Sequence, residues 1–348
     1  MTRPQVTRRD VAHRAGTSVA VVSYVINDGP RNVKPETKER VLAAIKELGY
    51  RANAAARSLR TRRTMAIGLV VPDASSPFYG ALAREIEDEA FAAGYALLLG
   101  NAMEDKAREA AYVRTLLGRQ VDGLIVAPSS GYNSWLEDVA RSATTSIIID
   151  RDVQGVPITS VTVNNRDGAL AAVRHLISHG RVRIACIAGP RGVHPTEDRV
   201  DGWHRALAEG NLLADACPVT YGTFLQSDGF SKGMQLLSRG FRPDAIFTTS
   251  DEQAIGVLSA ASQLGIRVPD ELSVMGFDGL RNGQFCIPPL STVEQPLRLL
   301  AQSAVRRVID ARPIEPRSPE RIEMTTRLVL RRSCGCDFAM QADGESVN

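Results

Sequence analysis

From residue 65 onward, short apolar runs alternate with longer segments whose apolar residues recur at helical spacing. Runs of strand length occupy residues 65–71, 95–99, 123–127 and 146–150, with helical patterns at 78–94, 107–117 and 135–142 between them. Continuous apolar runs joined by helices are typical of parallel strands that are buried on both faces, as in βαβ units. The sequence therefore predicts an α/β body with parallel sheets.

The same pattern restarts near residue 168 and predicts a second, similar lobe. Helical patterns occupy 168–179, 199–209, 231–238 and 254–264, and strand-length runs occupy 184–188, 218–221, 245–248 and 272–277. A last helix at 297–309 and strand segments within 321–330 follow. A chain of 348 residues has room for two or three domains. A two-lobed body therefore leaves the first 64 residues as a separate head.

Electric charge separates the head from the body. Residues 1–64 hold 14 basic and 5 acidic residues, a formal net charge of +9, whereas the remaining residues hold 28 basic and 34 acidic ones, or −6. A small basic head on a mildly acidic body indicates a module that binds a polyanion. The alternative, a basic solvated tail, is disfavoured by the regular helical patterns of the same segment.

The head is predicted to hold three short helices. Thr7 and Asp10 form a capping-box pattern at the start of the first helix, and Gly16 interrupts the chain before Ser18, which can cap the second. Pro35 then opens a third helix, which ends near residue 49. Helix, short turn and helix are the elements of a helix-turn-helix.

The second helix would present Val19, Ala20 and Tyr24 outward. The first residues of a recognition helix meet base edges in the major groove, where apolar side chains can contact a thymine methyl. Tyr24 could reach a phosphate or a base. The alternative for these side chains is ordinary surface exposure.

A fourth, short helix is predicted between the head and the body. Asn53 can cap residues 53–60, and a basic linker, TRRT, follows. A helix this short is marginal alone, so it would need DNA and a second copy of itself. Leu59 would be its exposed apolar residue, suited to wedge between base pairs from the minor groove. The alternative is a flexible linker.

These motifs together resemble the LacI/GalR family of bacterial repressors. The resemblance is carried by VTRRDVAHRAG at 6–16, by Ser18, Val22-Ser23 and Asn27, by Pro35-Glu36-Thr37, by the LGY end at 48–50, and by Asn53 with Ala56-Arg57-Ser58-Leu59; it extends to about residue 333. It implies a homodimer, with a tetramer left open, on a pseudo-palindromic double-stranded DNA operator. The DNA-binding residues that it implies are Thr7, Ser18, Val19, Ala20, Ser23, Tyr24, Asn27, Asn53, Ala56, Arg57 and Leu59.

The chain departs from the family pattern in three segments. The recognition helix reads Val21-Val22-Ser23-Tyr24 where the family usually has Thr-Val-Ser-Arg, so a phosphate-binding hydroxyl and a base-reading arginine are missing. Lys34 replaces a capping serine before Pro35, and Ala52 replaces the usual proline before Asn53. These changes bear on the operator sequence more than on DNA binding.

The resemblance also gives the domain boundaries. We expect a DNA-binding domain at 1–52, a hinge helix and linker at 53–64, an effector-binding and dimerisation body at 65–333, and a tail at 334–348. Lobe one would comprise about 65–163 and 294–323, and lobe two about 164–293 and 324–333. The body resembles the periplasmic sugar-binding fold, in which a ligand lies in the cleft between two lobes.

Ligands of open α/β sheets bind at the carboxyl ends of the strands. The residues at those ends predict an effector site made of Phe78, Tyr79, Asp150, Arg151, Arg199, Phe224, Ser250, Asp251 and Asp278. Aromatic faces stack on a ring while Asp and Arg bind hydroxyls, so a sugar or a nucleoside is expected, with a sugar favoured. The alternative is that each aromatic side chain fills a core and each Asp caps a helix.

Other functions are disfavoured. The sequence lacks dinucleotide-binding, P-loop and nucleophile-elbow glycine motifs, so we expect no enzyme and no cofactor. A solute-binding protein would share the body but not the basic head. The chain has no apolar run long enough for a membrane span and no signal-peptide core, and its five cysteines are scattered, so a cytoplasmic protein is expected.

No metal site is expected from the sequence either. His175 and His179 lack the glutamate of a zinc-protease motif. Cys334 and Cys336 stand near the end of the chain without two further ligands nearby, which is weak support for a metal or redox site.

Overall fold

The computed structural model separates into two units, Met1–Thr64 and Met65–Asn348. The residues that it describes are 6–27, 32–51, 63–129, 131, 133–153, 155–212, 217–238, 242–310 and 319–336. Among these residues, no helix is long and apolar enough to cross a membrane.

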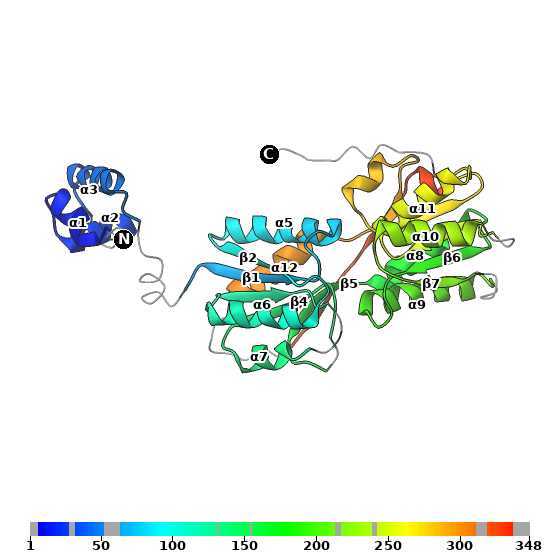
Figure 1. Ribbon diagram of the computed structural model, residues 1–348, viewed down its shortest axis with the longest axis horizontal. Helices are drawn as coiled ribbons and strands as arrows, with labels where there is room; N and C mark the ends of the chain where they lie inside the picture. Colours follow the sequence, from blue (N-terminus) through cyan, green and yellow to red (C-terminus); the bar gives the residue numbers. More distant parts are fainter. Residues whose placement is uncertain are drawn as a thin grey trace. The chain divides into compact units, whose positions relative to one another are not determined.

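The head contains α1 (Arg8–Arg14), α2 (Val19–Asn27) and α3 (Pro35–Leu48) (Figure 1). The Asp10 carboxylate accepts hydrogen bonds from the backbone N–H and the hydroxyl of Thr7, both at 2.7 Å, which fixes the start of α1. Gly16 and Gly49 adopt φ values of 61° and 62°, a left-handed conformation that glycine reaches without strain. The three helices share one small core: Val11, Ala12, Ala15, Val22, Val25, Val41 and Ala44.

Lobe one is built on a six-stranded sheet in the order β11-β5-β4-β3-β1-β2. Its strands are β1 (Ala66–Val71), β2 (Ala96–Asn101), β3 (Gly123–Val126), β4 (Thr145–Ile149), β5 (Thr159–Val163) and β11 (Arg321–Met324). Helices α5 (Pro77–Ala92) and α12 (Leu297–Ile309) contribute to the apolar core on one face, and α6 (Lys106–Gly118) and α7 (Trp135–Arg141) contribute to the core on the other.

Lobe two repeats this arrangement in the order β12-β10-β9-β8-β6-β7. Its strands are β6 (Ile184–Ala188), β7 (Val219–Tyr221), β8 (Ala245–Thr248), β9 (Ser273–Asp278), β10 (Ser291–Glu294) and β12 (Arg327–Val329). Helices α8 (Asn165–Ser178) and α9 (His194–Glu209) cover one face, and α10 (Gln226–Leu237) and α11 (Asp251–Gln263) cover the other. Short 3-10 helices, η2 (Arg281–Phe285) and η3 (Arg332–Cys334), complete the lobe.

The chain passes between the sheets three times, after β5, after β10 and after β11 (Figure 1). The predicted α/β class with parallel sheets is confirmed, and among the strand pairs of the described residues β10–β12 alone is antiparallel. The sequence missed β5 and β10, because they read TSVTV and STVE rather than as apolar runs, although both are largely buried. Helix α10 also starts at Gln226, five residues before the predicted start.

Candidate functional site

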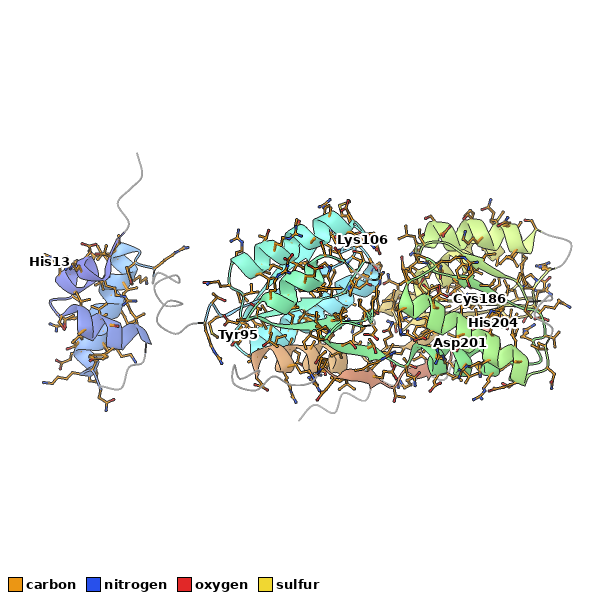
Figure 2. The ribbon with its side chains drawn as sticks, turned by 90° about the horizontal axis from the view of Figure 1, so that it is seen from below. His13, Tyr95, Lys106, Cys186, Asp201 and His204 are labelled. Carbon is orange, nitrogen blue, oxygen red and sulfur yellow. The ribbon has the colours of Figure 1, made fainter. Side chains whose placement is uncertain are left out.

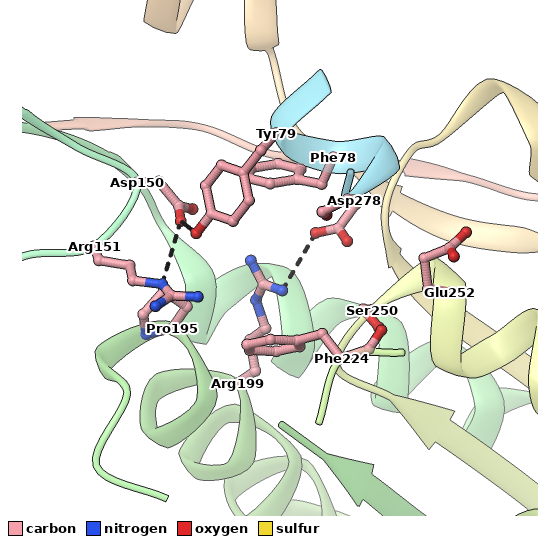
Figure 3. Close-up of a pocket in the computed structure, with 11 residues that line it drawn as sticks. Phe78, Tyr79, Asp150, Arg151, Pro195, Arg199, Phe224, Ser250, Glu252 and Asp278 are labelled. Atoms are coloured by element: carbon pink, nitrogen blue, oxygen red, sulfur yellow. Dashed lines mark hydrogen bonds and ion pairs between the residues drawn. The ribbon is translucent and has the colours of Figure 1, made fainter. Parts of the chain in front are cut away.

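A cavity of about 410 Å³ lies between the two lobes of the body (Figure 3). Lobe one contributes residues from α5 and from the end of β4, and lobe two contributes residues from α9, from the ends of strands and from the start of α11. The lining residues are Ser76, Phe78, Tyr79, Asp150, Arg151, Pro195, Arg199, Phe224, Ser250, Glu252 and Asp278.

The lobe-one wall is a buried hydrogen-bonded set. The Tyr79 hydroxyl donates to Asp150 at 2.8 Å, and burial raises the pKa of that hydroxyl well above its usual value. The Arg151 guanidinium donates to the carbonyl oxygens of Pro128 and Ser129 and forms an ion pair with Glu104 at 3.2 Å. These contacts hold the phenol ring and the guanidinium in place before any ligand arrives.

Arg199 is the most constrained side chain of the lobe-two wall. Its Nε donates to Asn165 at 2.8 Å, and its Nη1 donates to the Thr249 carbonyl at 2.6 Å and to Asp278 at 3.3 Å. The guanidinium carbon lies 3.8 Å from the centre of the Phe277 ring. Its Nη2 donates to no group among the described residues and is left for a ligand. Such a fixed guanidinium can bind hydroxyls at little cost in conformational entropy.

Asp278, at the end of β9, lies beside Arg199 on the lobe-two wall and is joined to it by a hydrogen bond (Figure 3). Its Oδ1 also accepts from Gln295 Nε2 at 2.8 Å. Burial raises the pKa of Asp278 to about 7, although the neighbouring Arg199 acts to lower it. Its backbone φ of 126° is unusual for a residue other than glycine. Such backbone outliers cluster at sites where side chains contact a ligand.

The structure brings most of the predicted effector residues to this cavity, but not Asp251. Both Asp251 oxygens are occupied inside lobe two, one by the Thr292 hydroxyl at 2.5 Å and one by the Leu280 N–H at 2.6 Å. Its neighbour Glu252 lines the cavity instead. Ser250 lines it too, and its hydroxyl caps α11 by accepting from the Gln253 N–H.

The sequence did not predict the residues that position Arg199 and Asp278. Asn165 and Gln295 hold Arg199 and Asp278, yet neither follows a recognisable apolar strand. Asn165 begins α8 directly after β5, and Gln295 follows β10. Neither strand is a continuous apolar run, so the sequence pattern does not mark its carboxyl end.

In the head, the start of α2 is exposed as a recognition helix requires. Ser18 Oγ accepts from the Val21 N–H at 3.3 Å, Val19 is 41% exposed and Ala20 is also exposed. Tyr24 and Ser23 are half-buried, so their outward reach is smaller than predicted. Thr7 is exposed and hydrogen-bonded to Asp10, and Asn27 ends α2. The predicted hinge residues Asn53, Ala56, Arg57 and Leu59 lie outside the described residues.

A second cluster of ligand-type side chains lies at the far end of α8. His175 and His179 face the C-terminal turn that carries Cys334 and Cys336, with nitrogen–sulfur distances of 3.3 to 3.6 Å. Burial raises the pKa of Cys334, but hydrogen bonds from His175 and Ser291 outweigh it and bring that pKa to about 7. Between 157 and 161 positions separate these histidines from the cysteines that they face, so no spacing in the sequence relates them.

Comparison with known proteins covers the head and the body. Residues 7–53 match the lacI family of bacterial regulatory proteins, and residues 173–334 match a periplasmic binding protein-like domain. The HTH-type transcriptional repressor PurR of Escherichia coli O1:K1 is 33% identical over 331 residues, which cover 94% of this chain and 96% of PurR.

Two solved structures extend the likeness to three dimensions. The Lac repressor dimer bound to operator and the anti-inducer ONPF has a TM-score of 0.83 at 27% identity, covering 95% of this chain and 99% of that one. The complex of the transcriptional regulator CelR with cellobiose has a TM-score of 0.70 at 30% identity, covering 95% and 100%. The family predicted from the head and hinge motifs is thereby confirmed. The chain belongs to the LacI family of bacterial regulatory proteins and is a DNA-binding transcriptional regulator with a ligand-binding body.

Proposed function

We propose that this chain is a repressor released from its operator by a neutral sugar bound in the cavity between the lobes. The observation that carries the proposal is the fixed pair of Arg199 and Asp278 beside the aromatic rings of Phe78 and Phe224. Sugar hydroxyls both donate and accept, so a guanidinium and a carboxylate on one wall can bind the same sugar. Aromatic faces can stack on the apolar faces of a pyranose or furanose ring.

The charges of the cavity favour an uncharged ligand. Its lining includes three carboxyl groups, Asp150, Glu252 and Asp278, against the two guanidinium groups of Arg151 and Arg199. Each guanidinium already has a carboxylate partner, at 3.2 Å for Arg151 and 3.3 Å for Arg199. A sugar phosphate would bring further negative charge into this set without a free cation to meet it. A neutral sugar meets no such cost.

A purine base or nucleoside is the second candidate. The observation in its favour is the number of aromatic rings: Phe78 and Tyr79 pack edge to face with centroids 5.1 Å apart, and Phe224 faces them from lobe two. The CelR complex, by contrast, contains cellobiose, which favours a sugar. In either case the ligand is proposed to be bound without being transformed.

We further propose that the body forms a homodimer through lobe one. Strand β2 is at the edge of its sheet and exposes Leu98 at 37% and Leu99 at 50%, and Phe91 on the adjoining α5 is 80% exposed. An exposed apolar edge strand makes a lone subunit prone to aggregation, and it offers a surface on which a second copy can pair. Two heads held in this way could read two half-sites of a pseudo-palindromic operator.

The effector would act by changing the angle between the lobes. Three chain segments join the two sheets, so a ligand that bridges both walls changes how lobe one is held. In a dimer this change is proposed to spread or close the two lobe-one units and so to melt or order the hinge helices. Effector and operator affinities must then be coupled reciprocally, typically by about 1–3 kcal/mol.

The test is a thermal-shift screen of the full chain against neutral sugars, sugar phosphates, purine bases and nucleosides, followed by operator binding with each hit. A ligand that binds only the folded state raises the melting temperature. We expect a neutral sugar to do so and to weaken operator binding. A shift with purines alone would establish the second candidate, and a shift with sugar phosphates alone would overturn the charge argument.

Variants link the response to the cavity. Arg199→Lys keeps the charge but loses the planar fork, so the sugar response should disappear while operator binding persists. Arg205→Ala is the matched control, because Arg205 is on the same helix but is exposed and pairs with Asp201 at 3.0 Å. An unchanged sugar titration in Arg199→Lys and in Asp278→Ala would remove these residues from the site.

A further inference from the structure

Four side chains that play no part in the effector cavity converge where α8 ends. His175 and His179 are one turn apart on the helix, and Cys334 and Cys336 flank Gly335 in the C-terminal turn. We propose that these residues form a zinc site, with one Zn²⁺ bound per chain by two imidazoles and two thiolates. This inference is independent of the effector proposal.

Three nitrogen–sulfur distances in the cluster are those of tetrahedral coordination. His175 Nε2 lies 3.3 Å from Cys334 Sγ and 3.5 Å from Cys336 Sγ, and His179 Nε2 lies 3.6 Å from Cys336 Sγ. A tetrahedral zinc with Zn–S near 2.3 Å and Zn–N near 2.0–2.1 Å separates its sulfur and nitrogen ligands by about 3.6 Å. The ligand atoms of His175, His179 and Cys336 all lie within 4.8 Å of one another. Cys334 lies outside this group of three and reaches the cluster through His175, so its side chain would have to turn toward the others when a cation binds.

The backbone of the C-terminal turn lets the two cysteines lie close to the histidines of α8. Gly335 has a φ of 103°, in the region that favours glycine, and it reverses the chain between the two cysteines. A Cβ at this position would lie 3.3 Å from Nδ1 of His179, tighter than most such contacts. Any other residue would therefore press on the imidazole that faces Cys336.

The chemistry of the four ligands selects the metal. Thiolates and imidazoles together favour zinc over magnesium, calcium or manganese, which prefer oxygen ligands. Four protein ligands leave no open position, which is the pattern of a structural site rather than a catalytic one. Cys334 is fully buried and the other three side chains are half-buried or exposed, so the metal could reach the cluster from solvent.

Such a metal would tie the turn that carries Cys334 and Cys336 to α8. The Cys334 carbonyl accepts from Ser273 at 3.2 Å, and the Ser333 hydroxyl donates to the Val274 carbonyl at 2.7 Å, so the turn already rests on β9. Zinc would add a cross-link from this turn to the helix whose first residue, Asn165, holds Arg199. Metal binding is therefore expected to stabilise lobe two.

The experiment uses the full chain, reduced and metal-free under anaerobic conditions, with Co²⁺ as a spectroscopic probe and Zn²⁺ as competitor. We expect one Co²⁺ per chain with the intense visible bands of tetrahedral coordination and a thiolate charge-transfer band, both abolished by one equivalent of Zn²⁺. Cys336→Ser and His179→Gln should each weaken Zn²⁺ binding by more than the ~10–100-fold that a supporting outer-shell residue is worth.

Two matched controls lie outside the cluster. Cys286→Ser removes a half-buried cysteine after η2, and His204→Gln removes an exposed histidine on α9 (Figure 2); both should bind metal like the parent chain. A third variant, His179→Cys, would supply three thiolates, so its charge-transfer band should grow by about half.

The result that overturns the proposal is octahedral or absent Co²⁺ binding in the reduced parent chain, or binding that Cys336→Ser leaves unchanged. Melting curves provide a readout that does not depend on the cobalt spectrum. Zn²⁺ should raise the melting temperature relative to chelator in the parent and in both controls, but not in His179→Gln. A further contrary result would be a Cys334–Cys336 disulfide that forms readily in metal-free protein, together with a melting temperature that Zn²⁺ does not raise after reduction. The two cysteines would then be a redox pair and not metal ligands.

Discussion

At the scale of single residues, Asp278 combines burial with the neighbouring positive charge of Arg199, and the balance favours the protonated carboxyl below neutrality. Its folded-state pKa of about 7 exceeds the value near 4 of an unfolded aspartate. Between these values the folded chain binds a proton that the unfolded chain has released. The contribution of Asp278 to the free energy of unfolding therefore falls as pH rises from about 4 to about 7. Burial raises the pKa of the nearby Asp251 in the same direction.

Asp278→Asn should remove the part of this pH dependence that belongs to Asp278. The free energy of unfolding of the variant, relative to that of the parent, is expected to rise by about 1–3 kcal/mol between about pH 5 and pH 8. Urea titrations at both pH values measure the difference. A difference that stays constant with pH would show that Asp278 does not titrate in this range.

Gly202 is a residue where the absence of a side chain decides the packing of two helices. A Cβ there would lie 2.2 Å from the Arg166 carbonyl oxygen and 2.9 Å from the Ala169 Cβ, both on α8. Gly202→Ala should therefore lower the free energy of unfolding by about 1–3 kcal/mol.

The control for this prediction is Gly118, the last residue of α6, whose Cβ would meet nothing within 4 Å. Gly118→Ala should raise the free energy of unfolding by about 0.5–1 kcal/mol, since glycine loses more conformational freedom on folding. Urea unfolding of both variants gives the comparison, and equal effects in the two would contradict the close-packing argument.

At the scale of elements, α8 connects two sites. Its first residue, Asn165, accepts from Arg199 in the effector cavity, and its last turn carries His175 and faces the C-terminal cysteines. Asn165 and His175 are ten positions apart on the helix, which corresponds to about 15 Å at 1.5 Å per residue. A rigid helix with a ligand at one end and a cross-link at the other is a physical route by which one site could bias the other.

The hinge is the element on which operator binding is expected to depend most. Leu59→Ala should weaken operator binding by about tenfold or more while leaving effector affinity unchanged, because the leucine is proposed to wedge between base pairs. Gel-shift titration and calorimetry measure the two affinities. Ser58→Ala, the neighbouring substitution, serves as control; equal operator affinity of the Leu59→Ala and parent chains would refute the wedge.

At the scale of the whole molecule, the distribution of charge distinguishes the DNA-binding head from the ligand-binding body. The basic residues are concentrated in the first 64 positions, with a net charge of +9, while the rest of the chain carries −6. Operator binding should therefore fall by about a thousandfold or more between about 50 mM and 200 mM salt, because phosphate contacts release condensed counterions.

Effector binding supplies the internal comparison for this salt response. A neutral ligand in a cavity whose charges are already paired should bind with nearly the same affinity across that range. Fluorescence anisotropy with labelled operator, and calorimetry with the effector, measure both on one preparation. An operator affinity that does not change with salt would contradict the basic head as the DNA-binding module.

The sequence by itself determined the family, the α/β class and the location of most cavity residues. The reason is local: apolar runs such as β1 and β8 identify buried parallel strands, and the residues that follow them must lie at one edge of a sheet. The capping pattern of Thr7 and Asp10 is likewise local, since its partners are three residues apart.

Only the tertiary structure decided what depends on residues that are distant along the chain. Asp251 and Glu252 are neighbours in sequence, yet the first turns into lobe two and the second faces the cavity. His175 and Cys334 are 159 positions apart, and no spacing rule relates them. Such pairs meet because α8 and the last turn of the chain pack on the same sheet, and that packing is a property of the whole fold.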